Sequence, residues 1–282
     1  MEFPLLLAAE VERNVLAALV EDIGGGDLTA LLTPGGRRAF GTVVCREDAV
    51  LAGRAWFESC FMHLDPQASI EWAVDDGESV AAGRTICEIE AGTRALLTAE
   101  RPALNFLQLL SGTATITARY AAAVAGTRAK IVDTRKTLPG LRLAQKYAVR
   151  CGGGTNHRLG LYDGILIKEN HILAAGGVTA ALKQAQALAS NGVFIQIEVE
   201  NLEQLAEALD AGATMILLDN MDLTQMHQAV GLTAGRAQLE ASGGVKLESV
   251  RAVAESGVDR ISVGSLTKDV RAIDLSLRHV EQ

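Results

Sequence analysis

The chain has 282 residues, of which 49% are hydrophobic and 21% charged, so it is long enough for one large or two ordinary domains and lacks the composition of a disordered or fibrous protein. Its net charge of -8 argues against a basic surface that coats nucleic acid or adheres to a membrane. Because there is no long apolar span, no basic secretory N-terminus and no CxxC pair, we expect a cytoplasmic protein with neither nucleic-acid nor membrane partners.

The first hundred residues predict a small domain of short helices and strands. Apolar residues recur on one helical face over residues 9–21, and a glycine run at 24–26 ends that helix. Short alternating segments bounded by turn signals predict strands at 41–46, 68–74 and 85–91, with a helix at 55–64 between them. A long helix follows from residue 100 to about 124, with Pro102 tolerated in its first turn.

Residues 75–91 resemble the hammerhead of biotinyl and lipoyl carriers. Those carriers need a modified lysine, whereas the first lysine of this chain is Lys130. A carrier role is therefore excluded. What remains is an N-terminal α/β sandwich domain, residues 1–112, with a binding or dimerisation role.

After residue 127 the pattern changes to apolar runs that end in polar residues and are followed by helical segments. Continuous apolar strands that alternate with helices predict a parallel sheet covered on its faces. The runs lie at 129–136, 164–170, 193–200, 214–220, 237–244 and 259–265. Six such units predict a compact, incomplete (open) β/α barrel over residues 113–269, with the tail 270–282 packing back on the first domain.

Basic residues are concentrated at the start of this second half. Residues 128–168 carry nine lysines and arginines against two acidic residues, and His157 adds another donor, which is typical of a cradle for a highly anionic small molecule. Three of them recur at helical spacing, and a solvated helix face explains them equally well: Arg142, Lys146 and Arg150. Three others stand at predicted strand ends, where barrel active sites lie: Arg135, Lys136 and Lys168.

Carboxylates occur at comparable strand ends. Glu198 and Glu200 share one face of a predicted strand, and Asp219 ends the next strand. Such carboxylates can hold Mg²⁺ jointly with substrate phosphates or stabilise a developing cation. Structural salt bridges to the lysines are the alternative, and that alternative is strongest for Glu200.

Two glycine-rich turns follow the last predicted strands. The segments ASGGV and SVGSLTKD place glycines beside hydroxyls where a strand meets a helix. Backbone N–H groups in such turns can hold a phosphate. Glycine also commonly closes a turn, but two of these turns on successive strands resemble the phosphate site of a barrel.

Across nearly its whole length the chain resembles the quinolinate phosphoribosyltransferase family, also called nicotinate-nucleotide pyrophosphorylase. The resemblance is carried, in order, by EDIGGGDLTA, ERPALNFLQLLSGTAT, DTRKTLPGLR, KYAVRCGGGTNHRLGLYDGILIKENHI, IEVENLEQ, ILLDNM, EASGGV and ISVGSLTKD. It implies that quinolinate and phosphoribosyl pyrophosphate, with Mg²⁺, give nicotinate mononucleotide, CO₂ and pyrophosphate in NAD biosynthesis. It also implies an N-terminal α/β sandwich, an open barrel of the type II phosphoribosyltransferase kind, and a homodimer with a shared active site.

The resemblance further implies a role for each site residue. The quinolinate carboxylates would be held by Arg101 from the partner subunit, Arg135, His157, Arg158 and Lys168. Lys136 would lie nearer the pyrophosphate, and Glu198 and Asp219 would stabilise the ribose cation directly or through Mg²⁺. The 5-phosphate would be held by Ser242, Gly243, Gly244 and Gly264. Many relatives have Ala and then His in the last phosphate loop where this chain has Ser265 and Lys268, and Lys268 can substitute there.

Three alternatives to this function are weighed. A paralogue acting on nicotinate would leave buried arginine charge unpaired, because it offers one carboxylate instead of two. A Schiff-base aldolase would use Lys168 as a nucleophile, but that lysine is predicted to lie among other cations. A regulator that binds a phosphorylated metabolite would retain binding without turnover.

Overall fold

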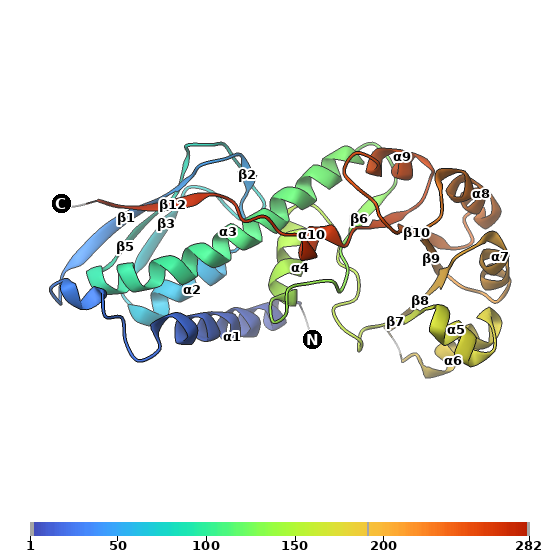
Figure 1. The fold of residues 1–282 in the computed structure, drawn as a ribbon, viewed down its shortest axis with the longest axis horizontal. Coiled ribbons are helices and arrows are strands. Elements are labelled where there is room, and N and C mark those ends of the chain that lie inside the picture. The colour runs from blue at the N-terminus through green and yellow to red at the C-terminus, as the bar shows by residue number, and fades with distance from the viewer. Residues whose placement is uncertain (1–2, 191, 281–282) are drawn as a thin grey trace. The chain divides into compact units, whose positions relative to one another are not determined.

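The computed structural model describes residues 3–190 and 192–280, which form two compact units (Figure 1). The first unit comprises residues up to 118, residues 137–153 and residues from 267 onward; the second comprises residues 119–136 and 154–266. Within the described residues, no helix is long and apolar enough to cross a membrane.

The first unit is built on a four-stranded antiparallel sheet with the order β12-β1-β5-β3. The predicted strands and the helix between them are confirmed, and the C-terminal strand pairs with β1, so the tail belongs to this unit. The elements are α1 (Phe3–Ile23), η1 (Ala30–Leu32), β1 (Arg38–Cys45), β2 (Ala49–Val50), α2 (Arg54–Leu64), β3 (Ser69–Trp72), β4 (Ser79–Val80), β5 (Thr85–Gly92) and β12 (Leu275–Val280).

An apolar core lies between this sheet and its helices. On α2, Trp56, Phe57 and Phe61 are completely buried, and the rings of the two phenylalanines lie 5.1 Å apart. The indole Nε1 of Trp56 donates to Asn14 Oδ1 on α1 at 3.0 Å. The core therefore provides a hydrogen-bond acceptor for the one polar atom of its largest ring.

The long helix α3 (Thr93–Ala123) begins seven residues earlier than predicted, so the expectation that Pro102 lies in its first turn is wrong. Proline inside a helix removes one hydrogen bond and costs roughly 3 kcal/mol. The apolar stripe nevertheless continues across it, since Leu96, Ala103 and Leu107 are all completely buried. Packing of this stripe outweighs the local cost.

The helix α4 (Arg142–Cys151) lies in the first unit, although our predicted boundaries place it in the barrel domain. Ala144 and Ala148 are completely buried and join the apolar core of this unit. The Tyr147 ring lies 5.6 Å from the Trp56 ring. Lys146 is also completely buried, so the interpretation of a solvated helix face is wrong for that residue.

The second unit is an open barrel. Its six strands are parallel in the order β6-β11-β10-β9-β8-β7, and the edge strands β6 and β7 are not paired with each other. All six predicted runs form strands: β6 (Lys130–Val132), β7 (Gly164–Ile167), β8 (Phe194–Val199), β9 (Met215–Asp219), β10 (Gln238–Ser242) and β11 (Arg260–Ser262). The connecting helices are α5 (Glu169–Ala175), α6 (Val178–Leu188), α7 (Leu202–Asp210), α8 (Leu223–Thr233) and α9 (Val250–Glu255), with α10 (Ser265–Lys268) after the last strand.

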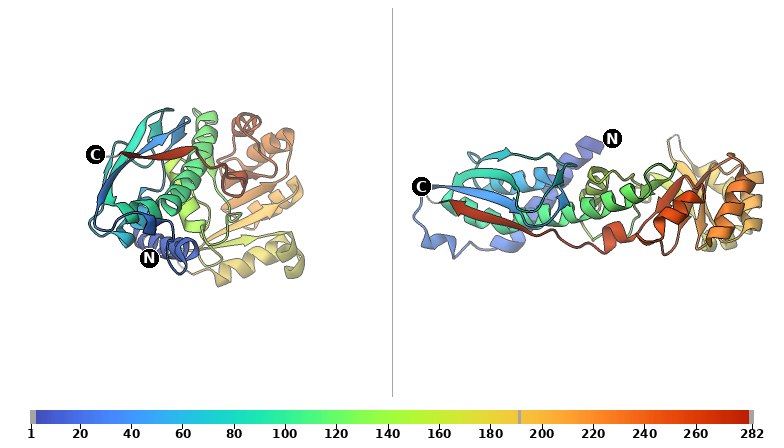
Figure 2. Two further views of the ribbon diagram at one scale, coloured as in Figure 1. Left: turned by 60° about the vertical axis from the view of Figure 1, so that its left-hand side comes forward. Right: turned by 90° about the horizontal axis from the view of Figure 1, so that it is seen from above.

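The two faces of the barrel sheet differ. Helices α6 to α9 cover one face (Figure 2), and the strand residues that point the same way are completely buried and apolar, among them Ile197, Ile216 and Leu218. Residues alternating with them point to the other face and include Gln196 and Glu240, which are also buried. The interior face of the barrel sheet is therefore buried, yet it carries polar side chains.

Candidate active site

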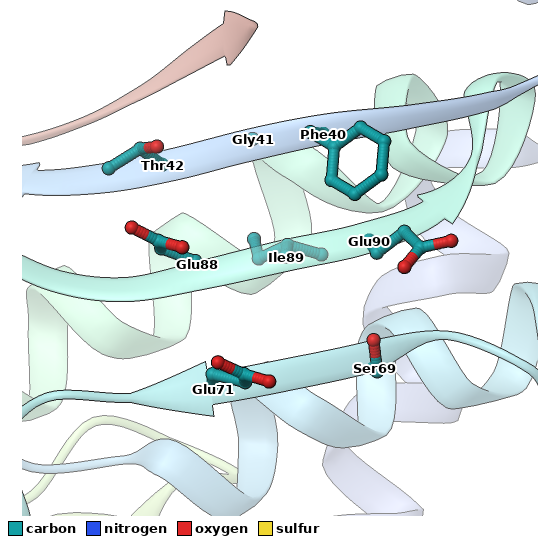
Figure 3. A pocket seen from close by; sticks show the side chains of 8 residues that line it. All are labelled: Phe40, Gly41, Thr42, Ser69, Glu71, Glu88, Ile89 and Glu90. Carbon is teal, nitrogen blue, oxygen red and sulfur yellow. The ribbon is translucent and has the colours of Figure 1, made fainter.

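One depression of the first unit can be set aside. It has a volume of about 400 Å³ and lies on the sheet formed by β1, β5 and β3 (Figure 3). Its lining includes three glutamates and no basic residue: Phe40, Gly41, Thr42, Ser69, Glu71, Glu88, Ile89 and Glu90. Such a lining repels an anionic substrate.

Most of the predicted site residues lie in the second unit at the carboxyl ends of its strands. The parallel sheet places these ends along one edge, which is where barrel enzymes bind their substrates. In the order of the sheet, the residues are Arg135 and Lys136 after β6, Gly264 and Ser265 after β11, Ser242 to Gly244 at the end of β10, Asp219 at the end of β9, Glu198 within β8 and Lys168 after β7.

Two arginines, the buried Arg158 and the half-buried Arg135, form a cationic pair whose charges interact. Arg158 is only 8% exposed, and its Nη1 donates to the Gly164 carbonyl at 2.9 Å. Burial lowers the pKa of Arg158, and the positive charge of Arg135 lowers it further, while Asp163 acts in the opposite direction. The Nε of Arg135 is buried and has no hydrogen-bond partner among the described residues. Both guanidinium groups would be stabilised by a bound anion.

Glu198 and Asp219 form the acidic part of the site. The Nζ of the half-exposed Lys168 lies 3.6 Å from Glu198 Oε2. Burial raises the pKa of Glu198, the lysine lowers it, and the neighbouring charge of Asp219 raises it again. Asn220, at a positive φ of 54°, donates from Nδ2 to Asp219 Oδ2 at 2.8 Å and so orients that carboxylate. The repulsion between these two neighbouring carboxylates would be relieved by a bound cation.

The loop after β10 can accept only glycine at its first position. Gly243 has a φ of +101°, and a Cβ there would meet Asn220 Oδ1. Gly244 also has a positive φ, +59°. Among the described residues, no acceptor is hydrogen-bonded to the amide N–H of either glycine. Consecutive amides of this kind form a concavity that can bind an oxyanion.

Lys136 lies against the loop after β11. A Cβ at Gly264 would come within 3.1 Å of Lys136 Cδ, so the absence of a side chain at this position lets the lysine pass over the loop. The Nζ of Lys136 would lie 3.9 Å from the same Cβ position. The structure therefore brings Lys136 and Gly264 together.

His157 is only 9% exposed and is engaged by the protein on both ring nitrogens. Its Nδ1 accepts from the Arg158 amide at 2.8 Å, and its Nε2 lies 2.7 Å from Gln196 Oε1. The amide of His157 donates to Asp133, which is itself completely buried. Sequence reasoning missed Asp133, Gln196 and the partner of the latter, Glu240. The period-two pattern of β8 and β10 contained a signal for the last two, because it places them on the same faces as Glu198 and Ser242.

The two remaining predicted residues, Arg101 and Lys268, belong to the first unit. Arg101 is exposed on α3. Lys268 is exposed, and its Nζ pairs with both carboxylate oxygens of Asp269, at 2.7 and 2.6 Å. That lysine is therefore already neutralised by its neighbour.

The acidic pair fits a magnesium ion that is shared with a substrate. Among the described residues, no group of three or more His, Cys, Asp or Glu side chains could hold a metal ion alone. Mg²⁺ is commonly bound by one or two carboxylates together with substrate phosphates. Glu198 and Asp219 provide such a partial set.

Comparison with known proteins places these features in one family. A model of the quinolinate phosphoribosyl transferase C-terminal domain matches residues 113–278, and a model of the N-terminal domain matches residues 27–111. The chain is 44% identical to a nicotinate-nucleotide pyrophosphorylase [carboxylating] of Mycobacterium leprae, over 94% of this chain and 95% of the relative. It is 42% identical to a quinolinate phosphoribosyltransferase [decarboxylating] of Nicotiana tabacum, covering 95% of this chain and 82% of the relative.

A solved structure agrees with the sequence comparisons. The nicotinate-nucleotide pyrophosphorylase from Francisella tularensis is 43% identical to this chain. It superposes with a TM-score of 0.92 and covers 97% of each chain.

Proposed function

The chain belongs to the quinolinate phosphoribosyltransferase (decarboxylating) family, and from that premise we propose how its residues divide the reaction among them. Quinolinate and phosphoribosyl pyrophosphate are converted to nicotinate mononucleotide, CO₂ and pyrophosphate. The observation that carries the proposal is the cationic pair of the buried Arg158 and the half-buried Arg135, whose Nε–H is buried without a partner among the described residues, in the same unit as the strand-end carboxylates Glu198 and Asp219.

Arg135 and Arg158 bind the two carboxylates of quinolinate. Arginine suits this role because its planar fork can pair with a carboxylate through two parallel hydrogen bonds. The lowered pKa of Arg158 supports the assignment, since a dianionic ligand would stabilise a charge that burial disfavours. Nicotinate has one carboxylate and would leave one of these two guanidinium groups unpaired.

Glu198 and Asp219 stabilise the ribose as the bond to pyrophosphate breaks. The pyridine nitrogen of quinolinate attacks C1 of the ribose, and positive charge develops on the sugar as pyrophosphate leaves with the bonding electrons. Carboxylates held in place before the reaction stabilise such charge mainly in the transition state. Asn220 orients Asp219 for this purpose through its 2.8 Å hydrogen bond.

The phosphates are held by the loops after β10 and β11. The amides of Gly243 and Gly244, with Ser242, bind the 5-phosphate, together with Gly264 and Ser265. Lys136 lies over Gly264 and neutralises the pyrophosphate. Mg²⁺ would be held by Glu198 and Asp219 and would supply further positive charge for the leaving pyrophosphate.

Decarboxylation follows from the charge produced by transfer. Once the ring nitrogen is bonded to ribose it is cationic. The bond between the ring and the adjacent carboxylate then breaks, CO₂ leaves, and the electron pair remaining on the ring carbon is stabilised by that nitrogen until it takes up a proton. This step calls for no further general base.

The active form is a homodimer in which Arg101 of each subunit completes the site of the other. The proposal is supported by exposed apolar side chains in both units that a second copy can cover. In the first unit Leu28, Leu31 and Leu32 are 81%, 63% and 83% exposed. In the second unit Leu161 and Tyr162, which follow Arg158, are 73% and 71% exposed. Patches of this kind are typical of protein interfaces.

The function is tested by turnover with quinolinate and with nicotinate, each with phosphoribosyl pyrophosphate and Mg²⁺. We expect nicotinate mononucleotide and CO₂ with quinolinate only. Turnover with nicotinate, or with neither acid, would contradict the substrate assignment and leave only the fold and the anion site.

The shared site is tested by mixing two variants of strongly reduced activity, Arg101→Ala and Asp219→Asn, after unfolding and refolding them together. In a mixed dimer one site has both native residues, so part of the activity should return. Sedimentation of a Leu31→Glu variant should show dissociation, whereas Leu188→Glu, at another exposed leucine, should not dissociate the dimer. A monomeric wild type with full activity would refute the dimer.

A further inference from the structure

A buried chain of polar side chains lies beneath the proposed quinolinate site. Gln196 is two residues before Glu198 on β8, and Glu240 is two residues before Ser242 on β10, so each points to the same face as the site residue that follows it. Gln196 is completely buried and Glu240 is 1% exposed. The two residues form a second layer of the barrel interior, toward the amino ends of the strands.

Hydrogen bonds join this layer to His157. Glu240 Oε2 accepts from Arg260 Nε at 2.9 Å and from Gln196 Nε2 at 3.2 Å. Gln196 Oε1 lies 2.7 Å from His157 Nε2. The opposite ring nitrogen, Nδ1, lies 2.8 Å from the amide nitrogen of Arg158.

Only one assignment of donors satisfies every link. The carboxylate of Glu240, paired with Arg260, can only accept, so Gln196 must turn its NH₂ group toward it. The carbonyl oxygen of Gln196 then faces His157 and requires a donor at Nε2. Since a backbone N–H can only donate, Nδ1 of His157 must be the acceptor. The direction of the whole chain is therefore fixed at both ends, by the carboxylate of Glu240 and by the amide of Arg158.

We propose that Glu240 and Gln196 are positioning residues for quinolinate binding, which hold His157 in its Nε2–H tautomer so that Nδ1 fixes the main chain of Arg158. This inference rests on the proposed function and departs from the role that the family resemblance implies for His157. His157 acts through Arg158 and presents no N–H of its own to a substrate carboxylate. The chain of hydrogen bonds holds the backbone amide of Arg158, and this amide in turn fixes where the Arg158 guanidinium lies.

The energetic cost of the arrangement supports a functional reason for it. Glu240 Oε1 is buried and has no hydrogen-bond partner among the described residues, although it lies 3.8 Å from His157 Nε2. Replacing buried charged groups by well-packed apolar residues often stabilises a protein. An apolar interior could not, however, offer an acceptor to the Nε2–H of His157, and that acceptor stabilises the tautomer that the Arg158 amide requires.

The test uses two variants of the intact protein. In Glu240→Gln the new amide can present either end to Gln196, so this end no longer fixes the direction of the chain and only the Arg158 amide still favours it. We expect the Kd for quinolinate to rise about tenfold, equivalent to the loss of one hydrogen bond, with little change in the Kd for phosphoribosyl pyrophosphate. In the double variant Gln196→Glu with Glu240→Gln, a carboxylate again accepts from His157 Nε2, and quinolinate affinity should return.

The double variant separates positioning from a structural role. Arg260 faces an amide in both variants, so a defect caused by loss of its ion pair would persist in both. Thermal unfolding should therefore remain lowered in the double variant while the Kd for quinolinate recovers. If affinity and stability instead fall and recover together, or if Glu240→Gln binds quinolinate as the wild type does, the proposal is wrong.

Nitrogen NMR of the ligand-free wild type reads the tautomer directly. The chain has five histidines, and a His157→Asn variant identifies the signals of this one. We expect a protonated Nε2 and an unprotonated Nδ1 at neutral pH, and mixed tautomers in Glu240→Gln. A wild type with protonated Nδ1 would overturn the proposal, whereas a wild type with the expected tautomer that fails to bind quinolinate would overturn the proposed function instead.

Discussion

The two sheets of this protein use their faces in opposite ways. In the first unit one face packs on an apolar core, and the other carries acidic side chains, with Glu71 directly opposite Glu88 on the neighbouring strand. In the second unit the helix-covered face is apolar, and the interior face is buried yet polar, with Gln196 and Glu240 in it. Buried polar groups are costly unless they are hydrogen-bonded. The second sheet therefore buries polar groups at a cost in folding free energy that a functional role can explain. The first sheet keeps its polar groups on an outer face.

The titratable groups show the same difference. In the first unit, burial alone raises the pKa of Cys60 to about 12, which only keeps a structural thiol neutral. In the second unit burial lowers the pKa of Arg158 and raises that of Glu198, so charges of both signs are disfavoured there. The proposed substrates relieve both, because quinolinate brings carboxylates to the arginines and the ribose of the second substrate develops positive charge beside Glu198. A shifted pKa indicates a functional site only where a bound ligand can stabilise the charged form of the group.

Removing a charge from the carboxyl end of a barrel strand should have the largest effect on catalysis. Asp219→Asn keeps the shape of the side chain but loses the negative charge beside the developing sugar cation. We expect kcat to fall about 10²- to 10³-fold, the usual cost of one preorganised electrostatic contact. Steady-state kinetics with quinolinate varied should show a smaller change in its KM. Glu200→Gln, an exposed carboxylate after the same kind of strand, is the control, and equal losses in the two variants would contradict the role of Asp219.

The buried arginine should come next. Arg158→Lys keeps the positive charge but loses the planar fork and its 2.9 Å bond to the Gly164 carbonyl. Quinolinate affinity should weaken by roughly 1.5–3 kcal/mol, which is about tenfold or more, because charge-assisted hydrogen bonds are lost. Calorimetric titration with quinolinate measures it. The same substitution at the exposed Arg128 serves as the control, and unchanged affinity for Arg158→Lys would remove this residue from the site.

The sequence predicted the residues at the carboxyl ends of the barrel strands well, and those in the barrel interior poorly. Apolar runs identify parallel strands, and the ends of such strands meet at one edge, so the positions of Lys168 and Asp219 followed from pattern alone. Gln196 and Glu240 interrupt apolar runs, but only the fold brings the two together. The burial of Pro102 and Lys146 depends on packing between segments distant in the chain. Local patterns carry no information about such contacts.

A conservative change in the first unit should affect stability without affecting kinetics. The Tyr147 hydroxyl donates to Asp76 Oδ2 at 2.7 Å, and the same oxygen accepts from the Gly53 amide. Tyr147→Phe should lower the free energy of unfolding by about 0.5–1.5 kcal/mol, the net value of one hydrogen bond, and leave the KM for quinolinate unchanged. Thermal and denaturant unfolding measure the loss. Tyr120→Phe makes the same change on a buried ring of the second unit, where no hydrogen bond of the hydroxyl is found among the described residues. A change in KM for Tyr147→Phe would contradict the separation of roles.

The smallest effect should be a gain in stability at the active site. A carboxyl group with a raised pKa binds its proton more tightly in the folded state, so folding stability falls as the pH rises from the ordinary pKa through the raised one and stays lower above it. Glu198 is such a group because burial and the charge of Asp219 outweigh the attraction of Lys168. Glu198→Gln should therefore raise the unfolding temperature of the ligand-free protein at neutral pH, by a few degrees or less, and the gain should vanish below the ordinary carboxyl pKa. Calorimetry measures the unfolding temperatures of the wild type and Glu198→Gln at neutral and acid pH, with Glu200→Gln as the control. A gain that persists in acid would mean that packing, and not the buried charge, is the cause, and the contrast between the two sheets would then not extend to this residue.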